Sequence, residues 1–274
     1  MVDMTVPRAT IGTEQTIDKD TAQRPFMIAL SGKGGTGKTT VSSLLVDSLI
    51  RAGERPLLAV DADPNANLHE ALGLTVTETL GSMREDAFKK AIPAGMSRHQ
   101  YVRYRFRQVL VEGEGVDLLA MGRPEGSGCY CFSNDLLSES IESLQKDYRF
   151  VLMDTEAGME HISRGTLGSP DVLLIVSDPG ARGMRTATRI REIALSLGLP
   201  ADRMYLVQNR VKAGTPCTDD GPVPLIACIP EDPAIEAADL AGVPLVTIPD
   251  ESPARVAVAA LAGRLREMAA ERRV

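Results

Sequence analysis

The sequence predicts a doubly wound α/β domain, in which helices cover both faces of a mostly parallel sheet. Short, continuously apolar runs alternate with segments of helical periodicity from residue 26 onward. Such runs are typical of strands that are buried on both faces, as in parallel sheets. The most distinctive polar residues follow directly after these runs. Because parallel sheets bind ligands at the carboxyl ends of their strands, these polar residues are expected to meet at one edge.

The expected elements follow one another without an internal repeat, a low-complexity tract or a linker. Strands are expected at residues 26–31, 56–61, 116–121, 149–154, 171–177, 203–208 and 224–229, with a further short candidate at 244–247. Helices are expected at residues 38–52, 98–111, 132–146, 183–197, 232–240 and 253–271. We therefore expect a single domain over residues 26–274. Residues 1–25 lack hydrophobic periodicity and are expected to form a flexible N-terminal extension.

Composition and charge narrow the classes of function. The 274 residues are 43% apolar and 24% charged, which is typical of a soluble globular protein. The net charge of −7 disfavours binding to nucleic acid or to an anionic membrane. No apolar run approaches the ~20 residues that span a bilayer, and the N-terminus lacks the apolar centre of a signal peptide. We expect a cytoplasmic protein with neither nucleic acid nor membrane as partner.

The clearest motif is Ser-Gly-Lys-Gly-Gly-Thr-Gly-Lys-Thr-Thr at residues 31–40, between an expected strand and an expected helix. Its spacing matches a phosphate-binding loop, whose backbone N–H groups and following helix N-terminus attract phosphate. Lys38 is expected to reach the β- and γ-phosphates, and the Thr39 hydroxyl to bind Mg²⁺. The residues expected to hold ATP or ADP here are Gly32, Lys33, Gly34, Gly35, Thr36, Gly37, Lys38, Thr39 and Thr40.

Further candidates follow two other strands. Asp154 ends the strand at 149–154 and is the expected partner of the magnesium coordination shell, while the N–H of Gly158 could contact the γ-phosphate. Asp63, in the run Asp-Ala-Asp-Pro, is the candidate for orienting the attacking water. Its alternative role is a turn or helix cap, because Asp-Pro begins many turns. Asp61 is a further candidate for the magnesium shell.

Asn209 and Arg210 follow the strand at 203–208 and are candidate nucleotide-binding residues. The Asn209 amide could hydrogen-bond an adenine edge. Without a nucleotide partner, Asn209 would be an ordinary turn residue.

Cys129 and Cys131 are separated by one residue, so both sulfurs can face the same side of an extended chain and chelate one soft ion. Two such pairs across a two-fold axis would supply four thiolates. A redox pair and two incidental thiols are the alternatives.

In a reducing compartment, four cysteines indicate metal, redox or core roles more than a disulfide framework. Cys228 lies in an apolar run and is expected in the core, and Cys217 lies in a polar loop and is expected to be an exposed thiol.

Two segments support rival functions. Residues 101–107 interleave aromatic residues with arginines, as nucleic-acid surfaces can, but an apolar stripe at helical spacing favours an ordinary amphipathic helix. The arginine-rich helix at 253–271 could target a membrane. Its apolar side has no Trp or Phe anchor, so packing against the sheet is favoured.

The loop at residues 31–40 resembles the deviant phosphate loop of the MinD, ParA, ArsA and nitrogenase iron protein group. The resemblance implies an ATP-dependent homodimer in which the second lysine, here Lys33, crosses the interface to the partner's ATP. It also implies catalytic roles for Lys33, Lys38 and Asp63.

Residues 121–134 and 154–164 resemble the CooC-type carbon monoxide dehydrogenase accessory ATPases, and the likeness extends over nearly all of residues 26–250. This implies an ATPase that couples dimer closure to nickel handling, with the nickel carbon monoxide dehydrogenase as its client. Cys129 and Cys131 would then hold Ni²⁺ or Zn²⁺ at the dimer interface, and the sequence does not choose between the metals. Two alternatives stay open, namely an electron-transfer ATPase like the nitrogenase iron protein and a MinD/ParA-like positioning ATPase.

Overall fold

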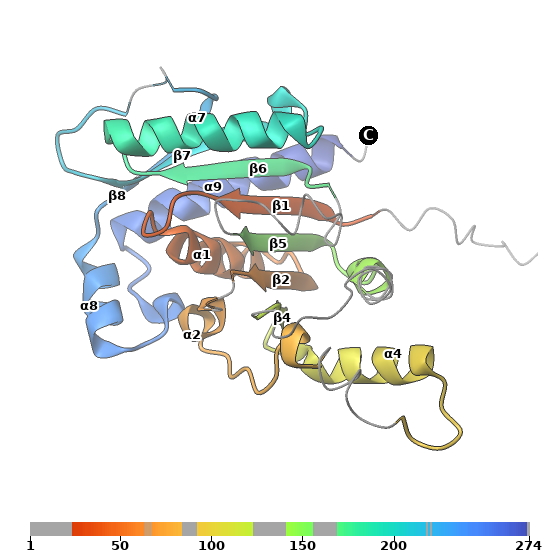
Figure 1. Ribbon diagram of the computed structural model, residues 1–274. Helices are drawn as coiled ribbons and strands as arrows, with labels where there is room; N and C mark the ends of the chain where they lie inside the picture. The colour runs from red at the N-terminus through yellow and green to blue at the C-terminus, as the bar shows by residue number, and fades with distance from the viewer. Residues whose placement is uncertain are drawn as a thin grey trace, which may run out of the picture.

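The chain folds around one central sheet, whose strands run side by side in Figure 1. The computed structural model describes residues 24–63, 65, 67–83, 92–122, 141–155, 169–217, 219 and 221–272. Within these residues the strands pair in the order β3-β4-β2-β5-β1-β6-β7-β8. All neighbouring strands are parallel except β3 and β4, which are antiparallel. The predicted doubly wound α/β fold is therefore confirmed.

The strands are β1 (Phe26–Ser31), β2 (Leu57–Ala62), β3 (Val111–Glu112), β4 (Val116–Ala120), β5 (Phe150–Thr155), β6 (Val172–Ser177), β7 (Met204–Val211) and β8 (Leu225–Pro230). The helices are α1 (Lys38–Arg51), α2 (Leu68–Leu72), α4 (Arg98–Val109), α7 (Ala181–Ser196), α8 (Pro233–Ala241) and α9 (Pro253–Glu271). Two short 3₁₀ helices are η2 (Ala201–Arg203) and η3 (Leu245–Thr247). Each of the predicted strands up to residue 229 corresponds to an observed strand, with boundaries shifted by at most three residues.

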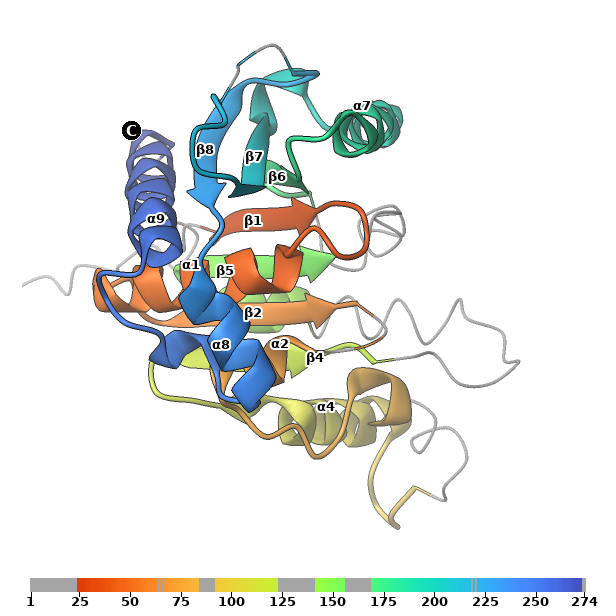
Figure 2. The same cartoon turned by 90° about the vertical axis from the view of Figure 1, so that its left-hand side faces the viewer.

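Alternate residues of each strand enter two hydrophobic cores, one on each face of the sheet. In β1, Ile28 and Leu30 join the core with α1 and α9, whereas Met27 and Ala29 join the core with α4 and α7. Figure 2 shows α1, α8 and α9 on one side of the sheet and α7 on the other. Because the strand is buried on both faces, it carries no alternation of polar and apolar residues.

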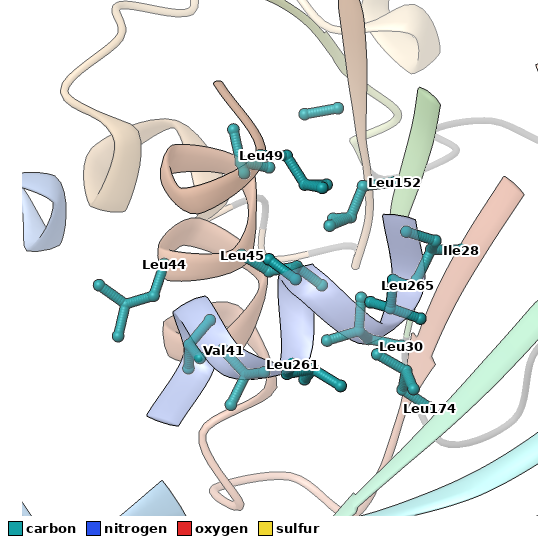
Figure 3. Packing of buried hydrophobic residues seen from close by; sticks show 14 of the residues in the cluster. Ile28, Leu30, Val41, Leu44, Leu45, Leu49, Leu152, Leu174, Leu261 and Leu265 are labelled. Carbon is teal, nitrogen blue, oxygen red and sulfur yellow. The ribbon is translucent and has the colours of Figure 1, made fainter. Parts of the chain in front are cut away.

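The C-terminal helix α9 packs against the sheet and α1. Leu261 and Leu265 are fully buried, and Figure 3 shows them beside Leu45 of α1 and Leu30 of β1. Packing against the sheet, the role favoured by the sequence, is confirmed. In the part of the chain that the structure describes, no helix has the length and apolar character needed to cross a bilayer.

The short elements differ from the prediction. The predicted strand at 244–247 is wrong, because this segment forms the 3₁₀ helix η3. Pro244 cannot donate a ladder hydrogen bond, and the segment instead packs Leu245 and Val246 against the core. Helix α2 and strand β3 were not predicted because five and two residues are too few to show periodicity. Of the predicted helix at 132–146, residues 141–145 are helical, and the remainder lies outside the described residues.

A buried carboxylate ties the chain together at the amino ends of the strands. Asp171 accepts hydrogen bonds from the side chains of Arg24, at 2.8 Å, and Arg272, and from the backbone N–H of Met27 at 2.9 Å. Arg272 also donates to the carbonyl of Pro25. The start of β1 is thus fixed at the end of the sheet opposite to the glycine-rich loop.

A second carboxylate joins α8 to α9. Asp232 is the N-cap of α8 and accepts from the N–H of Ala234, while its other oxygen accepts from the N–H of Ala254 and the hydroxyl of Ser252. Burial alone would raise the pKa of Asp232, but the hydrogen bonds from Ser252, Ala254 and Ala234 together lower it below its ordinary value. The ionised form therefore stabilises both helix starts.

The substitution Asp232→Ala is expected to lower the free energy of unfolding by about 1–3 kcal/mol, because three donors lose their acceptor. Since the folded pKa of Asp232 is lowered, its contribution is present above the unfolded pKa of about 4 and is lost as pH falls through the folded pKa. Urea unfolding at pH 7 and pH 3 measures both effects. Asp239→Ala, at an exposed position of the same helix, is the matched control. Equal losses in the two variants would contradict the double-capping role.

Candidate functional site

The predicted site residues meet at the carboxyl edge of the sheet. Strand β5 pairs with β1 and with β2, and in this register Asp154 is level with Leu30 on one side and with Asp61 on the other. The glycine-rich loop, residues 31–40 and called here the P-loop, leaves β1 directly beyond Leu30. The prediction that these segments converge at one edge is confirmed for the described residues.

Close contacts fix the P-loop on the sheet. A Cβ at Gly32 would lie 2.3 Å from the carbonyl oxygen of Val176 in β6, so only glycine lets the loop pack there. The Thr36 hydroxyl donates to the carbonyl of Lys33 at 2.9 Å and closes a turn within the loop. Lys38 is buried at 8% exposure, whereas Lys33 is exposed. The two lysines thus differ in their access to solvent, because Lys38 is buried and Lys33 is exposed.

A bulge in β7 also contacts the P-loop. Gln208 pairs with Cys228 and Val211 with Pro230, so two residues, Asn209 and Arg210, stand opposite a single residue of β8. The Asn209 amide donates to the carbonyl of Thr36, and the Arg210 guanidinium donates to the carbonyl of Gly35, both at 2.8 Å.

The contact between this bulge and the P-loop depends on a left-handed backbone conformation at two positions, Arg210 and Gly37. Arg210 has a φ of 57°, which costs a non-glycine residue about 1–2 kcal/mol. Gly37 has a φ of 85°, and a Cβ there would lie 2.4 Å from the Asn209 amide nitrogen. Asn209 and Arg210 therefore hold the loop backbone in the structure, and contact of Asn209 with an adenine edge stays a prediction.

Thr39 and Asp154 form the part of the site that fits a magnesium ion with a nucleotide. The Thr39 hydroxyl donates to Oδ2 of Asp154 at 2.7 Å. The other oxygen, Oδ1, is buried and has no hydrogen-bond partner among the described residues. Burial raises the pKa of Asp154 to about 7, and the charges of Asp61 and Asp63 add to this, while the Thr39 hydrogen bond and Lys38 oppose it. An unpaired buried oxygen of this kind is suited to accept from a metal-bound water.

Asp61 and Asp63 make local hydrogen bonds to backbone. Asp61 is buried and accepts from the N–H of Leu68, at 2.9 Å, and of Asp63, at 3.2 Å, so it caps α2 from outside that helix. Burial raises the pKa of Asp61 to about 6, although these two hydrogen bonds oppose the shift. The Asp63 carboxylate accepts from the N–H of Asn65 at 2.9 Å, as a turn former does. The magnesium role of Asp61 and the catalytic role of Asp63 stay predictions.

A cavity of about 700 Å³ adjoins the P-loop where β7 and β8 end. It is lined by Thr40, Asn209, Arg210, Ala213, Pro230, Glu231, Asp232, Pro233, Ile235, Glu236, Asp239 and Leu245. Its position beyond the phosphate-binding residues fits the nucleoside part of a nucleotide. Residues 230–233, which form one wall of this cavity, were not predicted from the sequence as site residues. The Pro-Glu-Asp-Pro run directly after the strand at 224–229 was the signal for it.

Three predicted site residues, Gly158, Cys129 and Cys131, lie outside the described residues. The prediction of a free thiol at Cys217 is wrong, because Cys217 and Cys228 form a disulfide. Cys217 is exposed, as predicted, whereas Cys228 is partly buried and not in the core. Cys217 was expected as a free exposed thiol and Cys228 as a core residue. Their Cα atoms lie 6.5 Å apart, a proximity that sequence spacing does not reveal.

The substitution Asp154→Asn is expected to reduce the pH dependence of stability and to remove most of the Mg²⁺-dependent part of ADP binding. Because the folded pKa of Asp154 is about 7, the free energy of unfolding should fall as pH rises from about 4 through about 7, and the variant should lose much of that fall. Urea unfolding between pH 5 and pH 8 and ADP titrations with and without Mg²⁺ measure the two effects. Asp202→Asn, exposed at the opposite end of the sheet, is the control. An unchanged pH slope would count against this account of Asp154.

Comparisons with known proteins agree with the site. Residues 26–196 match the family model described as an AAA domain. An ATP-binding protein of Methanocaldococcus jannaschii is 42% identical over 236 residues, which cover 83% of this chain and 93% of that protein. The carbon monoxide dehydrogenase accessory protein CooC of Rhodospirillum rubrum is 35% identical over 235 residues, 78% of this chain and 87% of that protein.

Solved structures show the same fold. The septum site-determining protein MinD of Pyrococcus horikoshii, complexed with Mg-ADP, superposes with a TM-score of 0.66 and 26% identity, covering 89% of this chain and 97% of that one. A ParA family ATPase of Chlorobium tepidum superposes with a TM-score of 0.68 over 87% of this chain and 98% of that one, at 19% identity. The chain therefore belongs to the AAA-domain family and is a P-loop ATPase of the MinD/ParA-like group.

Proposed function

We propose that this ATPase couples ATP-dependent pairing of two copies of the chain to nickel handling during assembly of the carbon monoxide dehydrogenase active-site cluster. The 35% identity to the carbon monoxide dehydrogenase accessory protein supports this choice of client. The nickel or zinc ion is cargo here, whereas ATP and Mg²⁺ drive the cycle. The proposal has three parts, which concern the phosphates, the pairing of subunits and the cysteines.

The phosphate part follows from the P-loop and Asp154. The backbone of residues 32–37 would hold the phosphates, and Lys38 would place its charge at the β- and γ-phosphates. Thr39 would bind the magnesium ion, and the free Oδ1 of Asp154 would accept from the ion's hydration shell. The bound Mg²⁺ would supply charge neutralisation at the phosphoryl group. Asp63 would orient the attacking water and Gly158 would donate its N–H to the γ-phosphate.

The pairing part depends on Lys33. Its side chain is exposed, unlike that of Lys38, and no ion pair engages it among the described residues. A cation that faces outward from a phosphate-binding loop can reach the phosphates of a facing subunit. We therefore assign Lys33 to the ATP of the partner copy, so that ATP draws two copies together and hydrolysis releases them.

One observation supports the metal part: strand β4, which precedes the Cys-x-Cys segment in the sequence, ends at the same edge of the sheet as Asp61 and Asp154. Strand β4 ends at Ala120, level with Asp61, and the next residue, Met121, donates its N–H to the Asp61 carbonyl at 2.8 Å. Cys129 and Cys131 follow within ten residues of this point. Two copies that meet at this edge would bring together four thiolates, which can hold one Ni²⁺ or Zn²⁺.

Lys33→Ala is expected to abolish ATP-dependent dimerisation and to lower the turnover number on the order of 100-fold, because a charge at the phosphates is lost. Binding of ATP to a single chain should change little, since Lys38 remains. Light scattering with a non-hydrolysable ATP analogue and phosphate release measure the two effects. Lys212→Ala removes another exposed lysine near the end of β7 and is the control. Normal dimerisation and turnover in Lys33→Ala would refute the proposed role of Lys33 in the pairing of two copies.

The double substitution Cys129→Ala/Cys131→Ala is expected to abolish binding of Ni²⁺ and Zn²⁺ by the dimer, with one ion lost for each two chains. Equilibrium dialysis with and without nucleotide measures the stoichiometry. Cys217→Ser/Cys228→Ser removes the other cysteine pair and should bind metal like the wild type. If the Cys129/Cys131 variant binds metal as tightly as the wild type, the proposed thiolate site is refuted. The assignment of the chain as an ATPase does not depend on this result.

A further inference from the structure

The disulfide between Cys217 and Cys228 joins the loop after β7 to strand β8, and other residues of these two segments line the cavity that adjoins the P-loop. Cys217 follows the end of β7, and Cys228 lies within β8. Ala213, four residues before Cys217, lines the cavity, and so does Pro230, two residues after Cys228. The bond therefore joins the two segments that carry neighbouring walls of the cavity.

Other contacts leave the segment before Cys217 weakly held. Residues 212–217 are all exposed, and the hydrogen bond found within them joins the N–H of Thr215 to the carbonyl of Lys212 at 3.0 Å. After Cys217, Asp219 accepts from the N–H of Leu225 at 2.6 Å and holds the later part of the loop. In the described part of the loop, Ala213 thus lies between two fixed points, the end of β7 at Val211 and the disulfide at Cys217.

The phosphate end of the site is held independently of the disulfide. Asn209 and Arg210 contact the P-loop directly, and Glu231 donates its N–H to the carbonyl of Val211 at 3.0 Å. These bonds join β7 to the P-loop and to β8 without using Cys217. Loss of the disulfide should therefore affect the nucleoside end of the site and leave the phosphate end unchanged.

We infer that Cys217 and Cys228 form a thiol–disulfide site that exchanges with low-molecular-weight disulfides and sets the affinity of the cavity for the nucleoside part of ATP and ADP. This inference rests on the placement of the nucleoside in that cavity. The oxidised form binds nucleotide more tightly, because the wall is already ordered before the ligand arrives.

The exchange has a defined order because the two sulfurs differ in exposure. Cys217 is exposed, so its thiolate attacks the small disulfide, forms a mixed disulfide and releases one small thiol. Cys228 is partly buried, and its thiolate then attacks the Cys217 sulfur and releases the second small thiol. One small-molecule S–S bond is broken and one protein S–S bond is formed. The two protein thiols are oxidised, and their two protons appear on the two small thiols.

Calorimetric titrations of the full chain with Mg-ADP and with Mg-tripolyphosphate test the inference. The wild type is compared after treatment with oxidised glutathione and after treatment with a phosphine reductant, and mass spectrometry determines the state of Cys217 and Cys228. Reduction is expected to weaken ADP binding roughly 3- to 10-fold, because one segment of the cavity wall must then become ordered when ADP binds. Tripolyphosphate, which has no nucleoside, should bind equally in both states.

Two variants separate the possible outcomes. Cys217→Ser/Cys228→Ser should bind ADP like the reduced wild type under both treatments, and the single variant Cys217→Ser should do the same. Equal ADP affinity in the oxidised and reduced wild type, a response that persists in Cys217→Ser/Cys228→Ser, or no disulfide after oxidation would each overturn the inference. Failure of the metal or pairing proposals would appear instead in the Cys129/Cys131 and Lys33 variants and would leave this result unchanged.

Discussion

The parallel pairing of β1, β5 and β2 is the constraint on which the nucleotide site depends. This register places the start of the P-loop, Asp154 and Asp61 at the same level of one sheet edge, although they are far apart in the sequence. The strands are buried on both faces, so their relative positions are fixed by two cores at once. A rigid arrangement of this kind lets a buried carboxylate with an unpaired oxygen persist, because the surrounding packing outweighs its cost.

The P-loop is held by contacts from strands on both sides of β1. Strand β5 supplies the Asp154 carboxylate for Thr39, β6 packs a carbonyl against Gly32, and β7 contributes the bulge with Asn209 and Arg210. The left-handed backbone of Arg210 is strained, and its guanidinium bonds the loop at Gly35. This hydrogen bond and that of Asn209 help to maintain the strained conformation.

The two cysteine pairs are proposed to have different roles. Cys129 and Cys131 are separated by one residue and are proposed to chelate a metal together with a second copy of the chain. Cys217 and Cys228 are brought together by the fold and are joined by a disulfide between two segments that also carry residues of the cavity. One pair would act on the cargo and the other on the nucleotide, so metal handling and redox state would meet through the same ATPase cycle.

Local patterns were sufficient to predict the fold class, most strands and the P-loop. Buried strands are continuous apolar runs, and the glycine and lysine spacing of residues 31–40 is a contiguous motif that needs no distant partner. Asp154 was also predictable, because it ends a strand whose carboxyl end must meet the others. The bracing by Asn209 and Arg210, the capping of two helices by Asp232 and the disulfide could not be predicted in the same way. Each joins residues that are neighbours only after the chain has folded, and sequence spacing does not encode the distance between them.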